Sequence, residues 1–349
     1  MGRSFWIMDD IAPLRQIAAS VMKPTRTRTT DNPDGQVGRV VAQPFRAASA
    51  TTDVVLASQE NVSGLQQRAA RATAPAAPRP VIKPFDGSNV FLFTPSVTYR
   101  TRYVAAPARP DGPEYPPVGA RIDYFLASPS GEAKLEILDA AGGVVRSYTS
   151  EARGAAAGGR GGRRGGGLTS TLPTKTGMNR FVWDLRYASG PAGSGTEMEG
   201  GGRDAGPLAA PGTYRARLTA GGVTKTESFT VKIDPRVAKD GVTTADLVEQ
   251  TKFSLKVRDA LAEARQLSQR VRQALDAKRG DQAKMQSLHE RLVTKSGPYE
   301  DQMFIDQLSN VAREISQADQ KVGASAYERF TELMKEWAAL KAEADSALR

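Results

Sequence analysis

The chain has 349 residues, 40% of them hydrophobic, with no cysteine, a single histidine and a formal net charge of +10. This length and apolar content are sufficient for two or three domains, each with its own core. The lack of cysteine excludes disulfides and thiolate ligands, and one histidine cannot form a histidine-based metal site, so we expect no metal and no cofactor. The positive charge is spread thinly, with +4 over 1–88, +5 over 89–234 and +1 over 235–349, which does not indicate a specific nucleic-acid site.

The N-terminal segment contains a short apolar stretch, Ser4–Met8, with the composition of a β-strand. Two acidic residues follow where a signal peptide would continue its apolar core, and no apolar run approaches the roughly 20 residues of a membrane span. We therefore expect no membrane span, and the sequence as written carries no export signal. Because a lone strand needs a sheet, we interpret residues 1–22 as the last strand and turn of a domain that is otherwise missing. Packing of Phe5 and Trp6 on the following β domain is the alternative.

Residues 23–88 are poor in large apolar side chains and rich in Gly, Pro, Ala, Thr and Arg. This composition predicts a disordered linker. Asp31, Asn32 and Asp34 resemble a calcium loop in composition only, because the required spacing and the distal glutamate are absent, so a turn is favoured. We expect residues 1–88 to be largely disordered and the remainder to fold without them.

Residues 89–234 show the period of two that half-buried strands require. In the expected strand Asn179–Tyr187, for example, the apolar residues Phe181, Trp183 and Leu185 share one face. About seven such strands between turn signals predict an antiparallel, immunoglobulin-like β-sandwich. The strands are expected at 90–93, 121–126, 134–138, 144–148, 179–187, 210–218 and 224–233, with a weaker pattern at 99–103.

Two glycine-rich segments, 153–167 and 189–206, interrupt the predicted sandwich and are interpreted as loops. Arg160, Arg163 and Arg164 give the first a resemblance to arginine-glycine tracts that bind RNA. A flexible loop is favoured because no aromatic residues are interleaved. Nucleic-acid contact through these arginines is kept as a weaker alternative.

Beyond Asp234 the apolar period changes to that of helices, and 235–349 is predicted to form an antiparallel helical bundle or hairpin. Thr243 and Asp246 form a capping-box pattern that starts the first long helix. A third helix carries an apolar stripe that continues to Val322, and a last helix follows Gly323. The helices are expected at 244–278, around 285–292, at 304–322 and from 324 onward.

Reactive side chains do not converge in a recognisable pattern. His289 is interpreted as a helix-surface residue, since no nucleophile or acid is positioned for it. Asp184 could contact a ligand, but a salt bridge to Arg180 or Arg186 is favoured. The Gly-x-Ser-x-Gly signature of serine hydrolases is absent. No residue is therefore assigned a catalytic, cofactor-binding or metal-binding role.

Six short motifs resemble the C-terminal part of bacterial proteins with sortilin-like, BNR-repeat β-propellers, which are often labelled glycosyl hydrolases. The motifs follow one another in the same order as in that family. The motifs are Gly2–Gln16, Leu92–Pro95, Glu136–Ala140, Asn179–Tyr187, Pro211–Tyr214 and Asp234–Arg236.

The resemblance implies an exported protein, periplasmic or extracellular, in which a signal peptide and large propellers come first. A sandwich resembling the immunoglobulin-like domain of flagellar hook-capping proteins follows, and then helices. Residues 24–80 do not resemble the connection found in that family. The chain therefore looks like a truncated frame, and its own compartment stays open.

The favoured hypothesis is a non-catalytic accessory module that packs against a β-propeller in cis or in trans, or against another protein. The alternative is part of a BNR-repeat glycosyl hydrolase whose active site, and any carbohydrate bound there, would belong to the missing propellers. No catalytic residue of that family can be assigned to this sequence.

Overall fold

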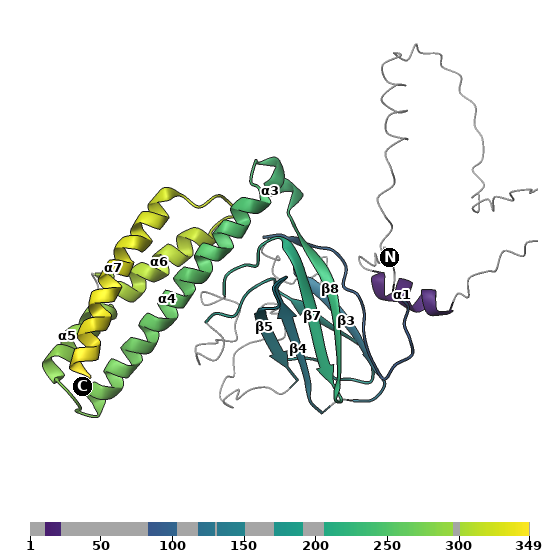
Figure 1. Ribbon diagram of the computed structural model, residues 1–349, viewed down its shortest axis with the longest axis horizontal. Helices are drawn as coiled ribbons and strands as arrows, with labels where there is room; N and C mark the ends of the chain where they lie inside the picture. Colours follow the sequence, from purple (N-terminus) through teal and green to yellow (C-terminus); the bar gives the residue numbers. More distant parts are fainter. Residues whose placement is uncertain are drawn as a thin grey trace, which may run out of the picture. The chain divides into compact units, whose positions relative to one another are not determined.

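The computed structural model describes residues 11–21, 83–102, 118–129, 131–150, 171–190, 206–295 and 301–348. Strands between Val90 and Ile233 come first and helices from Pro235 onward follow, which confirms the predicted order of a β region and then an α region (Figure 1). Both belong to one compact unit, residues 1–20 and 83–349. The second unit, residues 21–82, is described only at Val21.

The smaller sheet has three antiparallel strands. One of its faces is apolar, and Ile122 and Trp183 are fully buried there. On its other face Arg180 lies directly across from Asp123 and donates to both carboxylate oxygens, at 2.7 and 3.0 Å. The strand order is β1 (Val90–Leu92), β3 (Ala120–Leu126) and β6 (Gly177–Trp183).

The larger sheet has five strands and is mixed, whereas we expected antiparallel pairing throughout. The prediction is wrong at one edge, because Thr98 to Arg100 pair in parallel with Val231 to Ile233. The other neighbours pair antiparallel, as predicted. The strand order is β2 (Thr98–Arg100), β8 (Val223–Ile233), β7 (Gly212–Ala220), β4 (Ala133–Leu138) and β5 (Val144–Thr149).

Both sheets contribute to a single hydrophobic core, which follows from the period-two alternation of their strands. Trp183 of the smaller sheet is 0% exposed. Its ring centroid lies 5.3 Å from that of Tyr214 and 6.1 Å from that of Phe229, which belong to the larger sheet. Truncating an aromatic side chain in such a position typically costs about 3–5 kcal/mol of stability.

The strand predicted for 179–187 ends at Trp183, so the second part of that prediction is wrong. Asp184 accepts a hydrogen bond from the backbone N–H of Arg186 at 3.1 Å, a local bond that competes with strand pairing. Leu185 then adopts a left-handed conformation, with φ of 59°. Its side chain is still buried, as the sequence pattern predicted, but a turn rather than a strand places it there.

Helix α1 (Ala12–Val21) lies where we expected a turn followed by disorder, so the expectation is wrong for this segment. The side chain of Gln16 is buried and exchanges two hydrogen bonds with the backbone of Thr94, at 3.0 and 3.2 Å. Its backbone carbonyl also accepts from the N–H of Phe85 at 3.0 Å. The predicted strand at 4–8 and the acidic turn at 31–35 lie outside the described residues.

The helical region begins with a short helix and continues with the predicted long one, α4. Thr243 caps α4 by the capping box that the sequence indicated: its hydroxyl accepts from the N–H of Asp246, whose carboxylate accepts from the N–H of Thr243. The helices are α3 (Pro235–Lys239), α4 (Thr244–Asp276), α5 (Gln282–Leu292), α6 (Phe304–Ser316) and α7 (Ala324–Ala347).

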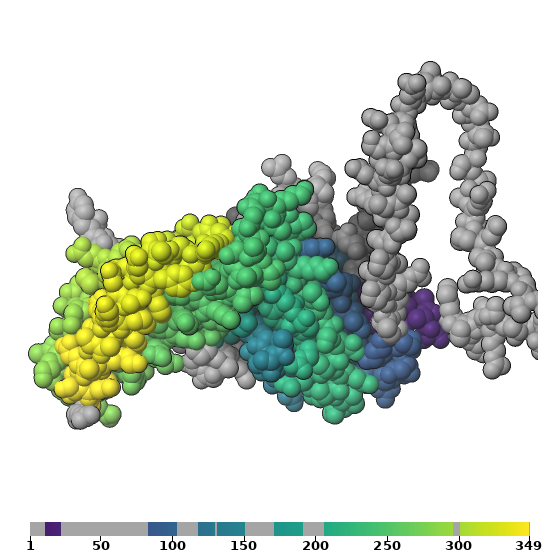
Figure 2. All heavy atoms as spheres, turned by 45° about the horizontal axis from the view of Figure 1, so that its top comes forward, coloured from purple at the N-terminus to yellow at the C-terminus, as the bar shows by residue number. Residues whose placement is uncertain are grey.

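Helices α4 to α7 share a second hydrophobic core. In the space-filling view α7, drawn in yellow, covers one side of this group (Figure 2). The stacked rings of Phe304 and Trp337, 5.3 Å apart, join α6 to α7 inside it. The predicted stripe residues Val257, Ala264 and Val271 of α4 are all fully buried in this core.

Helix α6 ends at Ser316, so the prediction that it continues to Val322 is wrong. The amide of Gln250, on α4, donates to the carbonyls of Ile315 and Ala318 at 2.9 and 2.7 Å. A tertiary contact thus satisfies carbonyls that a helix terminus leaves without partners. The chain then leaves the helix and turns toward α7.

Candidate binding cleft

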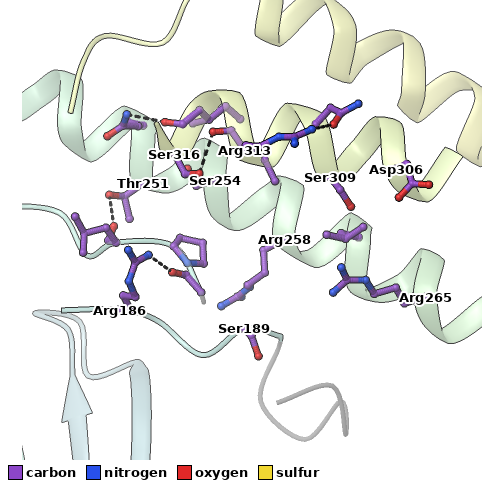
Figure 3. A pocket seen from close by; sticks show the side chains of 18 of the residues that line it. Arg186, Ser189, Thr251, Ser254, Arg258, Arg265, Asp306, Ser309, Arg313 and Ser316 are labelled. Carbon is purple, nitrogen blue, oxygen red and sulfur yellow. Dashed lines mark hydrogen bonds between the residues drawn. The ribbon is translucent and has the colours of Figure 1, made fainter. Parts of the chain in front are cut away.

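A cleft of about 890 Å³ lies between α4, α6 and the segments that follow β2 and β6 (Figure 3). Its volume falls within the range of roughly 300–1,000 Å³ that ligand sites usually have. Its described lining residues are Arg100, Arg102, Arg186, Ser189, Gly206, Pro207, Leu208, Gln250, Thr251, Ser254, Arg258, Leu261, Arg265, Thr294, Gln302, Asp306, Ser309, Asn310, Ala312, Arg313, Ile315 and Ser316.

One wall of the cleft is a single face of α4. Thr251, Ser254, Arg258, Leu261 and Arg265 follow one another at alternating spacings of three and four, which places them on one side of the helix. This face is adjacent to the buried stripe of α4. One wall of the cleft is therefore formed by a helix that is packed into the helical core.

Arg258 is held in place before any ligand arrives. Its side chain is 16% exposed, and two of its nitrogens donate to Asp259, at 2.8 and 2.7 Å. A third nitrogen donates to the carbonyl of Ala188 at 3.2 Å, so the residue also ties α4 to the loop beyond β6. Figure 3 shows the side chain reaching from α4 toward this loop.

Helix α6 supplies the opposite wall through Asp306, Ser309, Asn310 and Arg313. Near its start, the hydroxyl of Thr294 donates to Asp306 and accepts from the N–H of Met303 at 3.0 Å. Further along, Arg313 donates to the side-chain oxygen of Asn310. Thr294 thus connects the segment before α6 to the first turn of that helix.

The loop beyond β6 contributes Arg186. The turn at Asp184 and Leu185 directs this residue out of the strand, and its carbonyl accepts from the indole N–H of Trp183 at 3.0 Å. Its guanidinium donates from Nη1 to the carbonyl of Gly206 at 2.9 Å. A side chain that the strand pattern assigned to a sheet surface therefore lines the cleft.

Gly206 is required at its position because the backbone approaches it closely. A Cβ atom there would lie 2.1 Å from the carbonyl oxygen of Tyr187 and 2.6 Å from that of Ala188. Only glycine allows this contact, which brings the Gly206 carbonyl to Arg186. The two segments also form a bridge between Arg186 and Leu208.

The base of the cleft is a buried network around Arg100, at the end of β2. This side chain is 1% exposed and donates to Ala209 and Thr251 at 3.1 and 3.3 Å, to Gln250 at 2.8 Å and to Asp319 at 3.0 Å. Its Nε has no hydrogen-bond partner among the described residues. Burial lowers the pKa of Arg100, and the charge of Asp319 acts in the opposite direction.

The ionisable side chains among the described lining residues are six arginines and one aspartate. Arginine stays protonated at any physiological pH, so positive charge prevails among these residues, although Asp319 and Asp259 beside the cleft neutralise part of it. Burial lowers the pKa of Arg186, with Asp184 opposing it. Asp184 itself forms its salt bridge with Arg146, at 3.1 Å.

The sequence-based candidates lie elsewhere. His289 is half-buried on α5 and is not a lining residue. Asp184 pairs with Arg146 instead of Arg180 or Arg186, so that prediction is wrong. The turn after Trp183 is the reason, because it takes Asp184 out of the strand ladder. Arg160, Arg163 and Arg164 lie outside the described residues.

Sequence reasoning missed Arg258 and Arg265. A usable signal existed, since two arginines seven residues apart lie on one face of any helix. Nothing in the sequence, however, indicated which segments face that side of α4.

Within the described ranges, histidine and acidic residues do not group into a site that could hold a metal ion. None of the described helices combines the length and apolar character needed to cross a membrane.

Comparisons with known proteins add little to this description. No protein-family model and no curated protein matches the chain. Among solved structures, the crystal structure of CopC from Methylosinus trichosporium OB3b aligns with 41% of this chain and 94% of its own, at 14% identity and a TM-score of 0.18. A score this low supports no statement about fold or activity.

Proposed function

We propose that this chain is a non-catalytic interaction module, in which an immunoglobulin-like β-sandwich carries a helical bundle and the cleft between them binds a partner. The observation that carries the proposal is the composition of the cleft, with six arginines and one aspartate among its ionisable lining residues. Guanidinium groups bind anions well, but they do not exchange protons near neutral pH. Acid–base catalysis needs groups whose pKa lies near the working pH.

The aspartate in this set is already engaged. Asp306 accepts a hydrogen bond from Thr294, which in turn accepts from the N–H of Met303 just before α6. Its position indicates a structural role in fixing the first turn of the helix. The cleft is therefore better suited to hold a ligand than to transform one.

The immunoglobulin-like assignment of the β region is supported by the core that the two sheets share and by its central tryptophan, Trp183. The parallel edge strand β2 is a variation on that arrangement. Its role here is specific: Arg100, at the end of β2, links the sheets to α4 through Gln250 and Thr251.

The partner that the sequence motifs favour is a sortilin-like, BNR-repeat β-propeller, in the same chain or in another one. The motif Asn179–Tyr187 supports this because it ends in the turn that places Arg186 in the cleft. In this proposal the motif positions a binding residue rather than a catalytic one.

The proposal is tested by measuring binding and turnover on the same preparation of the full chain. We expect saturable binding to a purified sortilin-like β-propeller in biolayer interferometry, and no hydrolysis above background on a panel of glycosides and peptides. Turnover that co-purifies with the protein would overturn the non-catalytic assignment. A propeller that does not bind would overturn the choice of partner.

A further inference from the structure

We propose that the cleft recognises carboxylate groups, supplied either by acidic side chains of a partner protein or by a free polycarboxylate. This inference rests on the proposed function, since it names the chemistry that the binding module would recognise.

Two cleft arginines lack an acidic partner within the described residues. No carboxylate oxygen lies within 4.0 Å of the guanidinium of Arg186 or of Arg313 in that part of the chain. Arg186 is half-buried, and its guanidinium donates to the carbonyl of Gly206, its hydrogen-bond partner within the described ranges. Burial disfavours the charged form of this side chain more than the charge of Asp184 favours it. An arriving anion would correct this imbalance.

The arginines are also arranged to act together. Arg186 comes from the loop beyond β6, whereas Arg258 and Arg265 extend from one face of α4 into the same space (Figure 3). The contacts of Arg258 with Asp259 and Ala188 fix its guanidinium in advance. Such pre-organisation reduces the conformational entropy that binding would otherwise cost.

The guanidinium groups of this region already bind carboxylates in the folded chain. Arg100 and Arg102 both donate to Asp319, and Arg258 donates twice to Asp259. The planar guanidinium presents its N–H groups in a fork that matches a carboxylate. An acidic ligand would repeat a contact that the protein uses three times around the same cleft.

Phosphate is a less suitable ligand because the helix end beside the cleft already carries a carboxylate. Phosphates often bind at a helix N-terminus, where backbone N–H groups are unpaired. At the start of α6, the N–H of Met303 donates to Thr294, and Asp306 places a negative charge in the first turn. This helix end would repel an added anion, so the arginine side chains must provide the binding.

Hydroxyl and amide groups complete the lining. Ser254 on α4 and Ser309 and Asn310 on α6 face the cleft between the arginines. They can hydrogen-bond the polar backbone of a peptide, and Leu208 and Leu261 offer apolar contacts beside them. The surface thus accommodates more than a bare ion.

The experiment is isothermal titration calorimetry on the full chain, in a buffer without carboxylate or phosphate. The probes are citrate, a hexaglutamate peptide and, as a comparison, inorganic phosphate. We expect citrate or hexaglutamate to bind and phosphate to bind more weakly. Tighter binding of hexaglutamate indicates a partner protein as the source of the carboxylates, and tighter binding of citrate indicates a free polycarboxylate.

Variants locate the site. Arg186→Gln and Arg265→Gln should each weaken carboxylate binding about tenfold or more, the loss expected for one charge-assisted contact. Arg272→Gln is the matched control, because Arg272 is exposed on α4 and does not line the cleft. Arg313→Gln provides a second test in case the half-buried Arg186→Gln variant fails to fold, because Arg313 is exposed. This variant should bind carboxylates more weakly, and its circular dichroism spectrum should be unchanged.

The proposal is overturned if neither carboxylate probe binds, if phosphate binds more tightly than both, or if folded Arg265→Gln and Arg313→Gln bind as the unmodified chain does. These outcomes are separate from those of the proposed function. A chain that binds a propeller but not carboxylates refutes only this inference, whereas a chain that hydrolyses a substrate refutes the non-catalytic assignment.

Discussion

At the scale of single residues, Arg100 determines how the two parts of the described unit meet. It is fully buried, and its contacts run to the loop at Ala209, to α4 and to Asp319 beyond α6. A buried ion pair adds little net stability by itself, because desolvation offsets the attraction. Removing Arg100, however, leaves several buried acceptors without a donor and leaves Asp319 with Arg102 as its remaining partner. The residue is therefore a sensitive position for the whole arrangement.

We predict that Arg100→Met lowers the free energy of unfolding by about 3–5 kcal/mol, the usual cost of breaking a buried pair. The measurement is urea denaturation followed by tryptophan fluorescence. Arg100→Met combined with Asp319→Asn should recover little of the loss, because Asp319 keeps Arg102 as a partner in the single variant. A loss below about 1 kcal/mol in the single variant would show that the network does not hold the helices.

A second residue, Asp234, sets a pH dependence. Hydrogen bonds from Arg236 lower the pKa of this carboxyl below its ordinary 3.8, while burial acts in the opposite direction. Because the folded pKa is the lower one, the unfolded chain binds protons more readily. The stabilisation by Asp234 is therefore complete at neutral pH and is lost as the pH falls through 3.8 and then through the folded value.

We predict that Asp234→Asn reduces stability at pH 7 and flattens the fall in stability between about pH 4 and pH 2. Thermal unfolding across this range provides the measurement. Arg236→Met should give a smaller change in the same direction, because it removes the guanidinium but keeps the backbone N–H that donates to Asp234. An unaltered pH profile in both variants would refute the assignment.

At the scale of elements, local signals predicted what local forces determine. The capping box at Thr243 and the stripe along α4 were readable because both depend on residues within a few positions. The ends of β6 and α6 could not be predicted in this way. The strand ends where the side chain of Asp184 accepts from the N–H of Arg186, and α6 ends where Gln250, on α4, donates to carbonyls at its C-terminus. Helix α1 was missed because its packing depends on Thr94, far along the chain.

The capping box gives a direct test of this distinction. We predict that Thr243→Ala lowers the free energy of unfolding by about 0.5–2 kcal/mol, because the N–H of Asp246 loses its acceptor. Chemical denaturation measures the change. Thr243→Ser keeps the hydroxyl and should remain close to the original stability. Equal losses in the two variants would indicate that packing of the methyl group, rather than the cap, is responsible.

At the scale of the whole molecule, the cleft exists because three distant segments meet. Arg186, Arg258 and Arg313 are separated by tens of residues, and each sits in an ordinary local pattern. The sequence therefore predicted the helices and most of the strands, but it did not predict that these three arginines meet in one cleft. Long-range contacts such as those of Arg100 decide which faces adjoin, and no short motif encodes them. The absence of a recognisable catalytic motif said nothing about where binding would occur.

We propose that an anionic partner enters the arginine-lined cleft between α4, α6 and the loop beyond β6. Hydrogen–deuterium exchange on the full chain, with and without saturating hexaglutamate, locates the segments that the partner contacts. We expect slower exchange confined to 184–190, 206–210, the Thr251–Arg265 part of α4 and helix α6. Protection located on β4, β5 or α7 instead, or no change in the cleft segments at saturation, would contradict it.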